Sequence, residues 1–331
     1  MNSSLFRTIS LAKRGINNFF LKRPFCVSFE VTYRCNARCE HCHLGGPVDE
    51  VRATPQRYGE ICDELKPVVA QVSGGEPLLR KDLEQIIEAL TNRNDAPYVV
   101  VTTNGVLLTR ERYISLRQAG VDEFSLSLDF PDERHDEFRR VPGLFHKIKN
   151  LMEELSSEDK AVTLSGVVNR KNYKDLISMA ELAQEWGVRI NFSTYTWLRT
   201  KKKEYLIPQE EIPELRRIIK RLLQFKRKHG TVYPSDYVFQ KMVEFFEKES
   251  IPDCRAGEKF FVVNPDGSLS PCGLIIKNYK TQKEMQQDFL GQNTCSLCYT
   301  SIRANSEKPV KYLIRDSLKS LSYSIFGTSS R

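Results

Sequence analysis

Residues 35–42 are Cys35-Asn36-Ala37-Arg38-Cys39-Glu40-His41-Cys42, which places three cysteines in one short segment. A cubane iron–sulfur cluster needs four ligands, usually four thiolates, and no fourth cysteine lies nearby in the sequence. Three thiolates would leave one iron open, and an open metal position is where chemistry takes place. The alternative is a zinc site, because zinc binds both cysteine and histidine, and His41 and His43 stand beside the cysteines.

A second distinctive segment follows the cysteines. Residues 68–77 are Val68-Val69-Ala70-Gln71-Val72-Ser73-Gly74-Gly75-Glu76-Pro77, which predicts a buried strand that ends in a tight turn. Two consecutive glycines permit backbone angles that other residues resist, and Glu76 could pair with an ammonium group. The apolar residues 26–32 predict a strand directly before the cysteines as well.

Together these two segments resemble the radical S-adenosylmethionine (SAM) superfamily, whose hallmark is C-x3-C-x2-C at the end of the first barrel strand. His41 stands where that family usually has an aromatic residue. The resemblance implies that Cys35, Cys39 and Cys42 ligate a [4Fe-4S] cluster and that SAM chelates the fourth iron. It further implies that the amino group of SAM is bound by the turn formed by Gly74, Gly75, Glu76 and Pro77.

The chain pattern predicts an α/β fold. Six strand-then-helix units alternate within residues 25–230, and such alternation gives a parallel sheet with right-handed crossovers. The resemblance implies a partial (β/α)6 TIM-type barrel, the radical SAM core, in which function gathers at the carboxyl ends of the strands. The predicted strands are 26–32, 68–74, 98–103, 123–129, 161–168 and 188–193, and the predicted helices are 55–65, 81–91, 109–119, 144–155, 173–186 and 208–229.

Three further polar residues fall at predicted strand ends: Asn104, Ser127 and Asp129. Residues of this kind often only terminate a strand, and that interpretation stays open for Ser127 and Asp129. The resemblance implies that Asn104 lines the SAM pocket. It also implies that a polar residue at the end of the fourth strand contacts the SAM ribose, for which Ser127 is the closer match and Asp129 the other candidate.

A second set of four cysteines lies beyond residue 230. Residues 260–272 predict a β-hairpin that delivers one of them. Residues 231–305 resemble the SPASM/twitch extension of radical SAM enzymes, which implies one auxiliary [4Fe-4S] cluster. Structural zinc is the alternative, because four thiolates suit both metals. The cysteines concerned are Cys254, Cys272, Cys295 and Cys298.

Composition is that of an ordinary globular protein: 331 residues, 40% of them hydrophobic, enough for one large domain and a smaller one. Lys or Arg interrupts every apolar run, so we expect neither a membrane span nor a signal peptide. Nine cysteines in a chain that is not exported favour metal ligation over disulfides. The expected location is the cytoplasm, with peripheral contact to the inner membrane face as a further option.

Both ends of the chain are basic and amphipathic. Residues 1–24 hold five Lys or Arg and no acid, and these basic residues are set against apolar ones, which predicts an amphipathic helix. The apolar residues include Leu5, Phe6, Ile9, Leu11, Ile16, Phe19 and Phe20. Residues 306–331 are similar and would form a C-terminal helix or tail. Each end could pack on the barrel or rest on an anionic membrane, and the sequence leaves both options open.

The resemblance implies a reaction as well as a fold. SAM would be cleaved reductively at the cluster to a 5′-deoxyadenosyl radical, which takes hydrogen from an unactivated carbon of the substrate. The implied partner is a low-potential electron donor such as flavodoxin or ferredoxin.

The substrate is less constrained. The basic ends favour a lipid or isoprenoid or another small molecule, with a ribosomal peptide or a tetrapyrrole as alternatives. Residues 1–24 are too few for a separate peptide-binding domain. A zinc-binding scaffold or nucleic-acid binder is the non-enzyme alternative, but the basic stretches lack interleaved aromatic residues, and no nucleic acid is expected as a partner.

Overall fold

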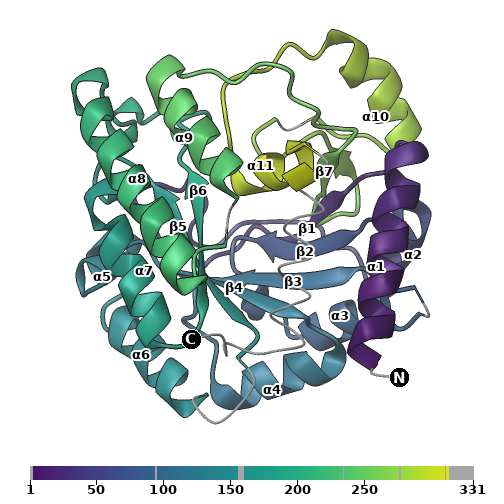
Figure 1. Ribbon diagram of the computed structural model, residues 1–331. Coiled ribbons are helices and arrows are strands. Elements are labelled where there is room, and N and C mark those ends of the chain that lie inside the picture. The colour runs from purple at the N-terminus through teal and green to yellow at the C-terminus, as the bar shows by residue number, and fades with distance from the viewer. Residues whose placement is uncertain are drawn as a thin grey trace.

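One sheet organises the molecule (Figure 1). The computed structural model describes residues 3–93, 95–155, 160–233, 235–275, 277–309 and 311–312. The strand order is β6-β5-β4-β3-β2-β1-β7-β8, with all neighbours parallel except the antiparallel pair β7 and β8. The strands are β1 (Cys26–Thr32), β2 (Val69–Gly74), β3 (Tyr98–Thr103), β4 (Glu123–Ser127), β5 (Val162–Val168), β6 (Arg189–Thr194), β7 (Phe260–Val263) and β8 (Leu269–Ser270).

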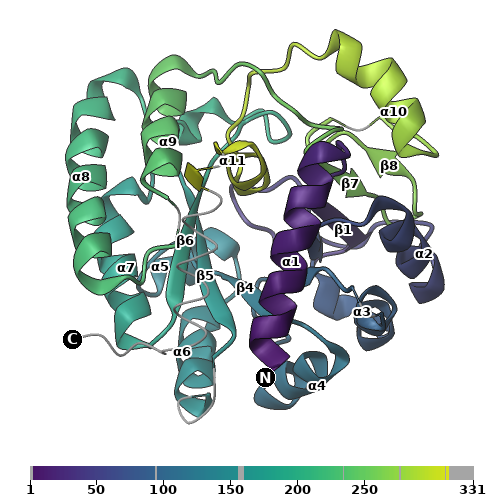
Figure 2. The same ribbon diagram turned by 45° about the vertical axis from the view of Figure 1, so that its right-hand side comes forward.

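Helices follow the strands and surround the curved sheet (Figures 1 and 2). The α-helices are α1 (Ser3–Phe20), α2 (Pro55–Leu65), α3 (Leu83–Thr91), α4 (Arg110–Ala119), α5 (Arg134–Arg139), α6 (Leu144–Glu154), α7 (Leu176–Glu185), α8 (Ile212–His229), α9 (Asp236–Lys248), α10 (Gln282–Phe289) and α11 (Ser301–Glu307). The short 3-10 helices are η1 (Pro77–Leu79), η2 (Tyr173–Asp175), η3 (Lys203–Tyr205), η4 (Gln209–Glu211) and η5 (Leu290–Gln292).

The predicted partial (β/α)6 barrel is confirmed, and its element boundaries follow local signals in the sequence. Helix α2 begins as predicted, because Pro55 occupies its first turn and the Thr54 side chain accepts a hydrogen bond from the Arg57 backbone N–H. Helix α8 ends at Gly230, whose φ of 74° suits glycine best. Such caps explain why predicted and observed boundaries differ by only a few residues.

The predicted hairpin beyond residue 230 is part of the barrel sheet. Strand β7 lies parallel to β1, with Cys26 opposite Phe260, and β8 then returns beside β7. The sequence pattern did not predict this pairing, nor helices α5, α9, α10 and α11, because strand pairing between distant segments leaves no periodic signal. The second cysteine set is therefore attached directly to the first barrel strand.

The side chains of strand β1 alternate between the two faces of the sheet. Phe29 is fully buried, and its ring meets the ring of Tyr58 from α2 edge-on at 6.2 Å. Successive residues of a strand point to opposite faces, so Ser28 and Glu30 point away from that helix. The Ser28 hydroxyl lies 2.7 Å from the Ser73 hydroxyl on β2. Glu30 is thereby directed into the barrel rather than into the helical layer.

Helix α1 lies beside the loops that lead into β2, β3 and β4. Arg14 donates to the carbonyl oxygen of Pro67, and Arg7 pairs with Asp122. Within the described residues no helix is both long and apolar enough to cross a membrane. The predicted C-terminal helix or tail, residues 306–331, lies outside the described residues from position 313 onward.

Candidate cluster and cofactor site

The cysteine loop follows β1 and closes on itself. The backbone groups of Cys35 and Gly46 bond to each other in both directions, and the N–H of Cys42 donates to the carbonyl oxygen of Cys39. All three cysteines carry free thiols that are partly exposed. Burial raises the pKa of Cys39 to about 11, with further increases from the neighbouring thiols Cys42 and Cys35. These mutual effects indicate that the three thiols lie near one another in the loop.

The Gly-Gly turn packs against the backbone that leads into this loop. The N–H of Gly75 donates to the carbonyl oxygen of Thr32 at 2.7 Å, and the N–H of Glu76 donates to that of Arg34 at 2.8 Å. A Cβ atom on Gly74 or on Gly75 would stand only 2.1 Å from one of these carbonyl oxygens. Only glycine fits at either position, so the two sequence motifs are physically joined.

Glu76 is fully buried beneath this turn. Its Oε1 accepts hydrogen bonds from the Thr103 hydroxyl at 2.7 Å and from the Leu78 N–H at 3.1 Å, and its Oε2 accepts one from the Asn104 N–H at 2.7 Å. Burial raises the pKa of Glu76 to about 7, although these donors oppose the increase. The carboxylate therefore clamps the end of β3 to the turn, and Oε2 keeps one acceptor position for a ligand.

Asn104 connects the end of β3 to the cysteine loop. Its Nδ2 donates to Asn36 Oδ1 at 2.8 Å and lies 3.8 Å from the Cys35 sulfur. Ser127 ends β4 as a buried residue, and its hydroxyl makes no hydrogen bond within the described part of the chain. Asn36 was not singled out from the sequence, because a partner of this kind becomes visible only when two strand ends are adjacent.

Asp129, two residues beyond β4, is bonded to α5 and to β5. Its carboxylate is fully buried, accepts a hydrogen bond of 2.7 Å from Arg139 Nε, lies 2.7 Å from Arg139 Nη2 in an ion pair, and accepts a hydrogen bond of 2.9 Å from the Val167 N–H. Asp129 thus positions Arg139. Its Oδ1 keeps one acceptor position for the predicted contact with the SAM ribose.

Arg139 itself was missed in the sequence. It is buried at the end of α5, and its charge lowers the pKa values of Cys35 and Cys39, which places the guanidinium beside the cysteine loop. Its Nε and Nη2 both contact the Asp129 carboxylate, while Nη1 makes no hydrogen bond within the described residues. A buried cation with a spare donor beside a metal site is suited to bind a carboxylate.

Helix α5 also fixes His41. The His41 ring stacks on Phe138 at 4.8 Å with an angle of 7° between the planes, and the Glu40 N–H donates to the Phe138 carbonyl oxygen. The Nδ1 atom of His41 is buried and has no hydrogen-bond partner. Burial lowers the pKa of His41 to about 4, so the ring is neutral near pH 7. A flat neutral ring with an orphaned nitrogen fits the edge of a bound cofactor.

The second cysteine set also converges. Burial raises the pKa of Cys272 to about 11, and the neighbouring Cys254 and Cys295 raise it further. Cys298, whose pKa burial raises to about 12, is affected by Cys272 and Cys295 in turn. In the described part of the chain no three or more His, Cys, Asp or Glu side chains are arranged around a single metal position. The thiols of a cubane cluster bind separate irons and stand further apart than those of a zinc site.

Arg303 fixes the backbone of this module. It is fully buried and donates to the carbonyl oxygens of Cys298 at 2.7 Å, Ile251 at 2.9 Å and Pro252 at 2.7 Å. Glu307 pairs with the same guanidinium at 2.8 Å. No sequence motif indicated this residue, because its partners are main-chain atoms far away in the chain.

A small cavity of about 20 Å³ is lined by His43, which follows the first cysteine set, and by Cys272 of the second set. Glu30 faces this cavity without a hydrogen-bond partner in the described residues, and burial raises its pKa to about 7. Arg199 enters from the loop after β6 and donates to the Gly273 carbonyl oxygen at 3.0 Å. The cavity therefore presents one carboxyl group and one guanidinium to any group that enters it.

Comparisons with known proteins agree with this geometry. Residues 29–183 match the family described as the radical SAM superfamily. These residues form a radical SAM domain. The chain is 36% identical over 172 residues to an AdoMet-dependent heme synthase of Methanosarcina barkeri (strain Fusaro / DSM 804), and this match covers 50% of the chain and 48% of that relative.

A second relative is mycofactocin maturase MftC of Mycobacterium tuberculosis (strain ATCC 25618 / H37Rv), 28% identical over 200 residues, or 58% of this chain and 49% of the maturase. The chain thus spans about half the length of each of these relatives. Among solved structures, Streptococcus suis SuiB bound to S-adenosylmethionine superposes with a TM-score of 0.63 at 16% identity, over 86% of this chain and 70% of SuiB. At that identity the likeness shows the shared fold.

The match of residues 29–183 to the radical SAM family gives SAM and a [4Fe-4S] cluster as the cofactors of this domain. Its residues fit them: three adjacent thiols, a turn in which only glycine is tolerated and an orphaned buried nitrogen on His41 meet at one edge of the sheet.

Proposed function

We propose that this enzyme reductively cleaves SAM at a [4Fe-4S] cluster ligated by Cys35, Cys39 and Cys42. The observation that carries the proposal is the joining of the cysteine loop, the Gly74-Gly75 turn and Asn104 by direct hydrogen bonds at one edge of the barrel. When bound, the cluster and SAM supply a 5′-deoxyadenosyl radical that abstracts hydrogen from an unactivated carbon. A low-potential donor such as flavodoxin or ferredoxin would supply the electron.

The protein residues hold and orient SAM. The remaining acceptor position of Glu76 Oε2 would receive the ammonium group, and Arg139 Nη1 would bind the SAM carboxylate beside the cysteines. The neutral ring of His41, stacked on Phe138, would border the adenosyl part, with Asn104 and the free hydroxyl of Ser127 as polar contacts. Burial of these groups would keep water from the reacting atoms.

Cys254, Cys272, Cys295 and Cys298 would ligate one auxiliary [4Fe-4S] cluster. All four ligands would come from the protein, so the site would be closed and would serve electron transfer or structure rather than substrate ligation. Two observations support a position for this cluster near the first site: β7 of the hairpin pairs with β1, and Cys272 lines the Glu30 cavity.

For the substrate we propose a tetrapyrrole, with a maturase-type peptide reaction as the second candidate. The lipid or isoprenoid expectation receives no support from the relatives, which are a heme synthase and a maturase. Arg199 supports a substrate with carboxylate groups, because a guanidinium binds them in a bidentate manner. It lines a cavity with room for about one water, so a carboxylate would meet it at the edge of this cavity. The peptide candidate rests on the maturase relative alone.

The test is anaerobic reconstitution with iron and sulfide, followed by SAM and dithionite, with detection of 5′-deoxyadenosine. The triple Cys35, Cys39 and Cys42→Ala variant should produce none, and Cys62→Ala, a buried thiol of α2, should retain production. Retained cleavage in the triple variant would refute the cluster assignment. Addition of a carboxylated iron porphyrin should accelerate cleavage in the native chain, and Arg199→Gln should lose only that acceleration.

A further inference from the structure

Helix α1 packs on the barrel through its polar side. Arg14 and Asn18 are buried, and Asn18 Nδ2 donates to the carbonyl oxygens of Pro24 and Lys66, both at 2.8 Å. Arg14 also bonds Asp95, and Arg7, two helical turns before Arg14, pairs with Asp122. These residues are spaced by seven and four positions and so share one helix face. An amphipathic helix on a soluble core normally buries its apolar face instead.

The opposite face of α1 is apolar and exposed. Ile9, Ile16 and Phe20 are 56%, 59% and 76% exposed and are again spaced by seven and four positions. Phe19 and Leu21 beside them are more than half exposed as well. Figure 2 shows α1 at the front of the molecule, with no other helix over its outer side. Exposed large apolar residues are thus concentrated on this one helix, and such concentration marks an interaction site.

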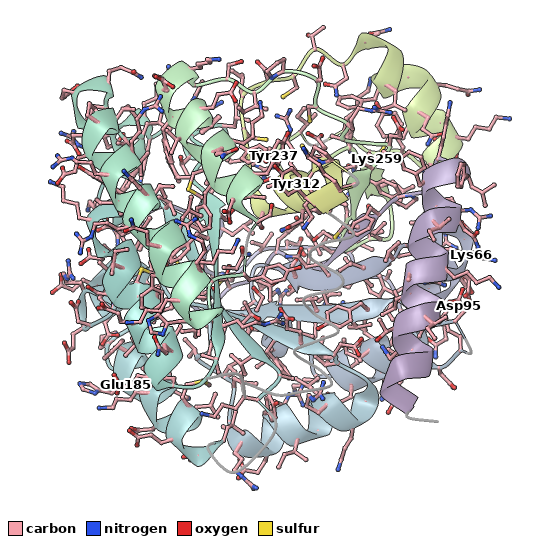
Figure 3. All side chains as sticks on the ribbon, in the orientation of Figure 1. Lys66, Asp95, Glu185, Tyr237, Lys259 and Tyr312 are labelled. Atoms are coloured by element: carbon pink, nitrogen blue, oxygen red, sulfur yellow. The ribbon has the colours of Figure 1, made fainter. Side chains whose placement is uncertain are left out.

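Positive charge surrounds this apolar face. Lys13 lies on the same stripe as Ile9 and Ile16, Lys22 follows the helix, and neither forms an ion pair in the described residues. Lys66 and Lys259 lie on the two sides of α1 in Figure 3, and the Lys259 ammonium group stands 4.9 Å from the centre of the Phe19 ring. Residues 1–24 contain no acid. A partner that complements this surface has an apolar interior and negatively charged groups at its edge.

We propose that the outward face of α1 docks on an anionic lipid surface, with Ile9, Ile16 and Phe20 inserted among the acyl chains and Lys13 and Lys22 at the headgroups. A second copy of the chain would bring like charges together, because its α1 is equally basic. Residues 313–331 would do the same, since they hold three basic residues and one acid. The lipid surface alone satisfies both the apolar and the charged parts.

The experiment is co-sedimentation of the full-length cluster-loaded protein with vesicles of phosphatidylcholine alone and of phosphatidylcholine with 30% phosphatidylglycerol. Binding is expected only to the anionic vesicles and should weaken with salt. The double variant Lys13→Gln, Lys22→Gln should partition onto the anionic vesicles about 25-fold less than the native chain, because each basic residue contributes about fivefold. Ile16→Gln with Phe20→Gln should reduce it by roughly 100-fold, about tenfold per buried side chain.

Substitution is preferred to deletion of α1, because Arg14 and Asn18 are part of the barrel contacts and their removal would disturb the fold. The matched control is Val51→Gln with Leu107→Gln, two exposed apolar residues outside α1, which should leave vesicle binding unchanged. Protein that stays in the supernatant with anionic vesicles at low salt would overturn the proposal. A stable dimer by light scattering that Ile16→Gln and Phe20→Gln dissociate would overturn it in favour of a second copy.

Discussion

Asp129 and Arg139 form a buried ion pair whose cation faces the cysteine loop. The Asp129 carboxylate is fully buried and Arg139 is only 7% exposed, so each depends on the other for its counter-charge. Asp129 also depends on the backbone donor of Val167. The sequence shows both residues but not their pairing, because α5 is only six residues long and carries no periodic signal. The cysteines and glycines, in contrast, were identified in advance, because their chemistry restricts the residue type at each position.

Arg139→Gln should destabilise the cluster-free protein by roughly 3–5 kcal/mol, because it leaves the Asp129 carboxylate buried without a counter-charge. The measurement is urea unfolding followed by circular dichroism, with reductant present. The control is Arg140→Gln, at the adjacent exposed residue. Its free energy of unfolding should stay within about 0.5 kcal/mol of that of the native chain. Equal unfolding midpoints for the two variants would show that the ion pair contributes nothing.

Glu76 predicts a pH dependence of stability. Burial raises its pKa from 4.5 to about 7, so between these values the folded chain keeps a proton that the unfolded chain has lost. The free energy of unfolding should therefore fall as the pH rises from about 4.5 to 7, by roughly 3 kcal/mol from this residue alone.

Urea midpoints of the cluster-free protein at pH 5, 6 and 7 would measure this slope. Glu76→Gln cannot ionise and should flatten it, although Glu30, whose pKa burial also raises to about 7, leaves a part of the slope in place. A variant whose slope matches that of the native chain would mean that Glu76 is ionised throughout. SAM should also flatten the slope if its ammonium group occupies the spare acceptor position.

At the scale of elements, the turn after β2 and the loop after β1 act as one unit. Their contact depends on the absence of side chains at Gly74 and Gly75, since the carbonyl oxygens of Thr32 and Arg34 occupy the space where Cβ atoms would lie. The strands and most helices of the barrel could be predicted, because apolar periodicity and caps are local. The pairing of β7 with β1 could not, because nothing local in either strand specifies its neighbour.

Gly75→Ala should displace the turn from the cysteine loop, because its Cβ atom would approach the Arg34 carbonyl oxygen to 2.1 Å. We expect a loss of more than about 2 kcal/mol in stability and a marked loss of SAM affinity by calorimetry. Gly291→Ala is the matched control, since a Cβ atom there meets nothing within 4 Å. A Gly75→Ala chain with native SAM affinity would show that the turn tolerates displacement.

At the scale of the whole molecule, β1 connects the two cysteine sets. The cysteine loop follows the carboxyl end of β1. On the side of β1 away from β2, β1 pairs with β7, the first strand of the hairpin that leads to Cys272. The Glu30 cavity is lined by His43 after the first set and by Cys272 of the second. This arrangement could not be predicted from cysteine spacing, because spacing describes ligand sets and not the distance between two sets. The two sites nevertheless have separate ligands and separate supporting residues, Arg139 for the first and Arg303 for the second.

Because different residues support the two cysteine sites, we expect that one cluster can be lost without the other. Cys272→Ala should remove one cluster and leave the other, so that iron falls from about eight to about four atoms per chain while 5′-deoxyadenosine is still produced. Iron and sulfide analysis of anaerobically reconstituted protein measures the first effect, and chromatography of the SAM reaction measures the second. Cys62→Ala, which removes a buried thiol of α2 away from both cysteine sets, is the control and should keep all of the iron. Zinc in place of iron at the second site, or loss of SAM cleavage together with the iron, would contradict two independent clusters.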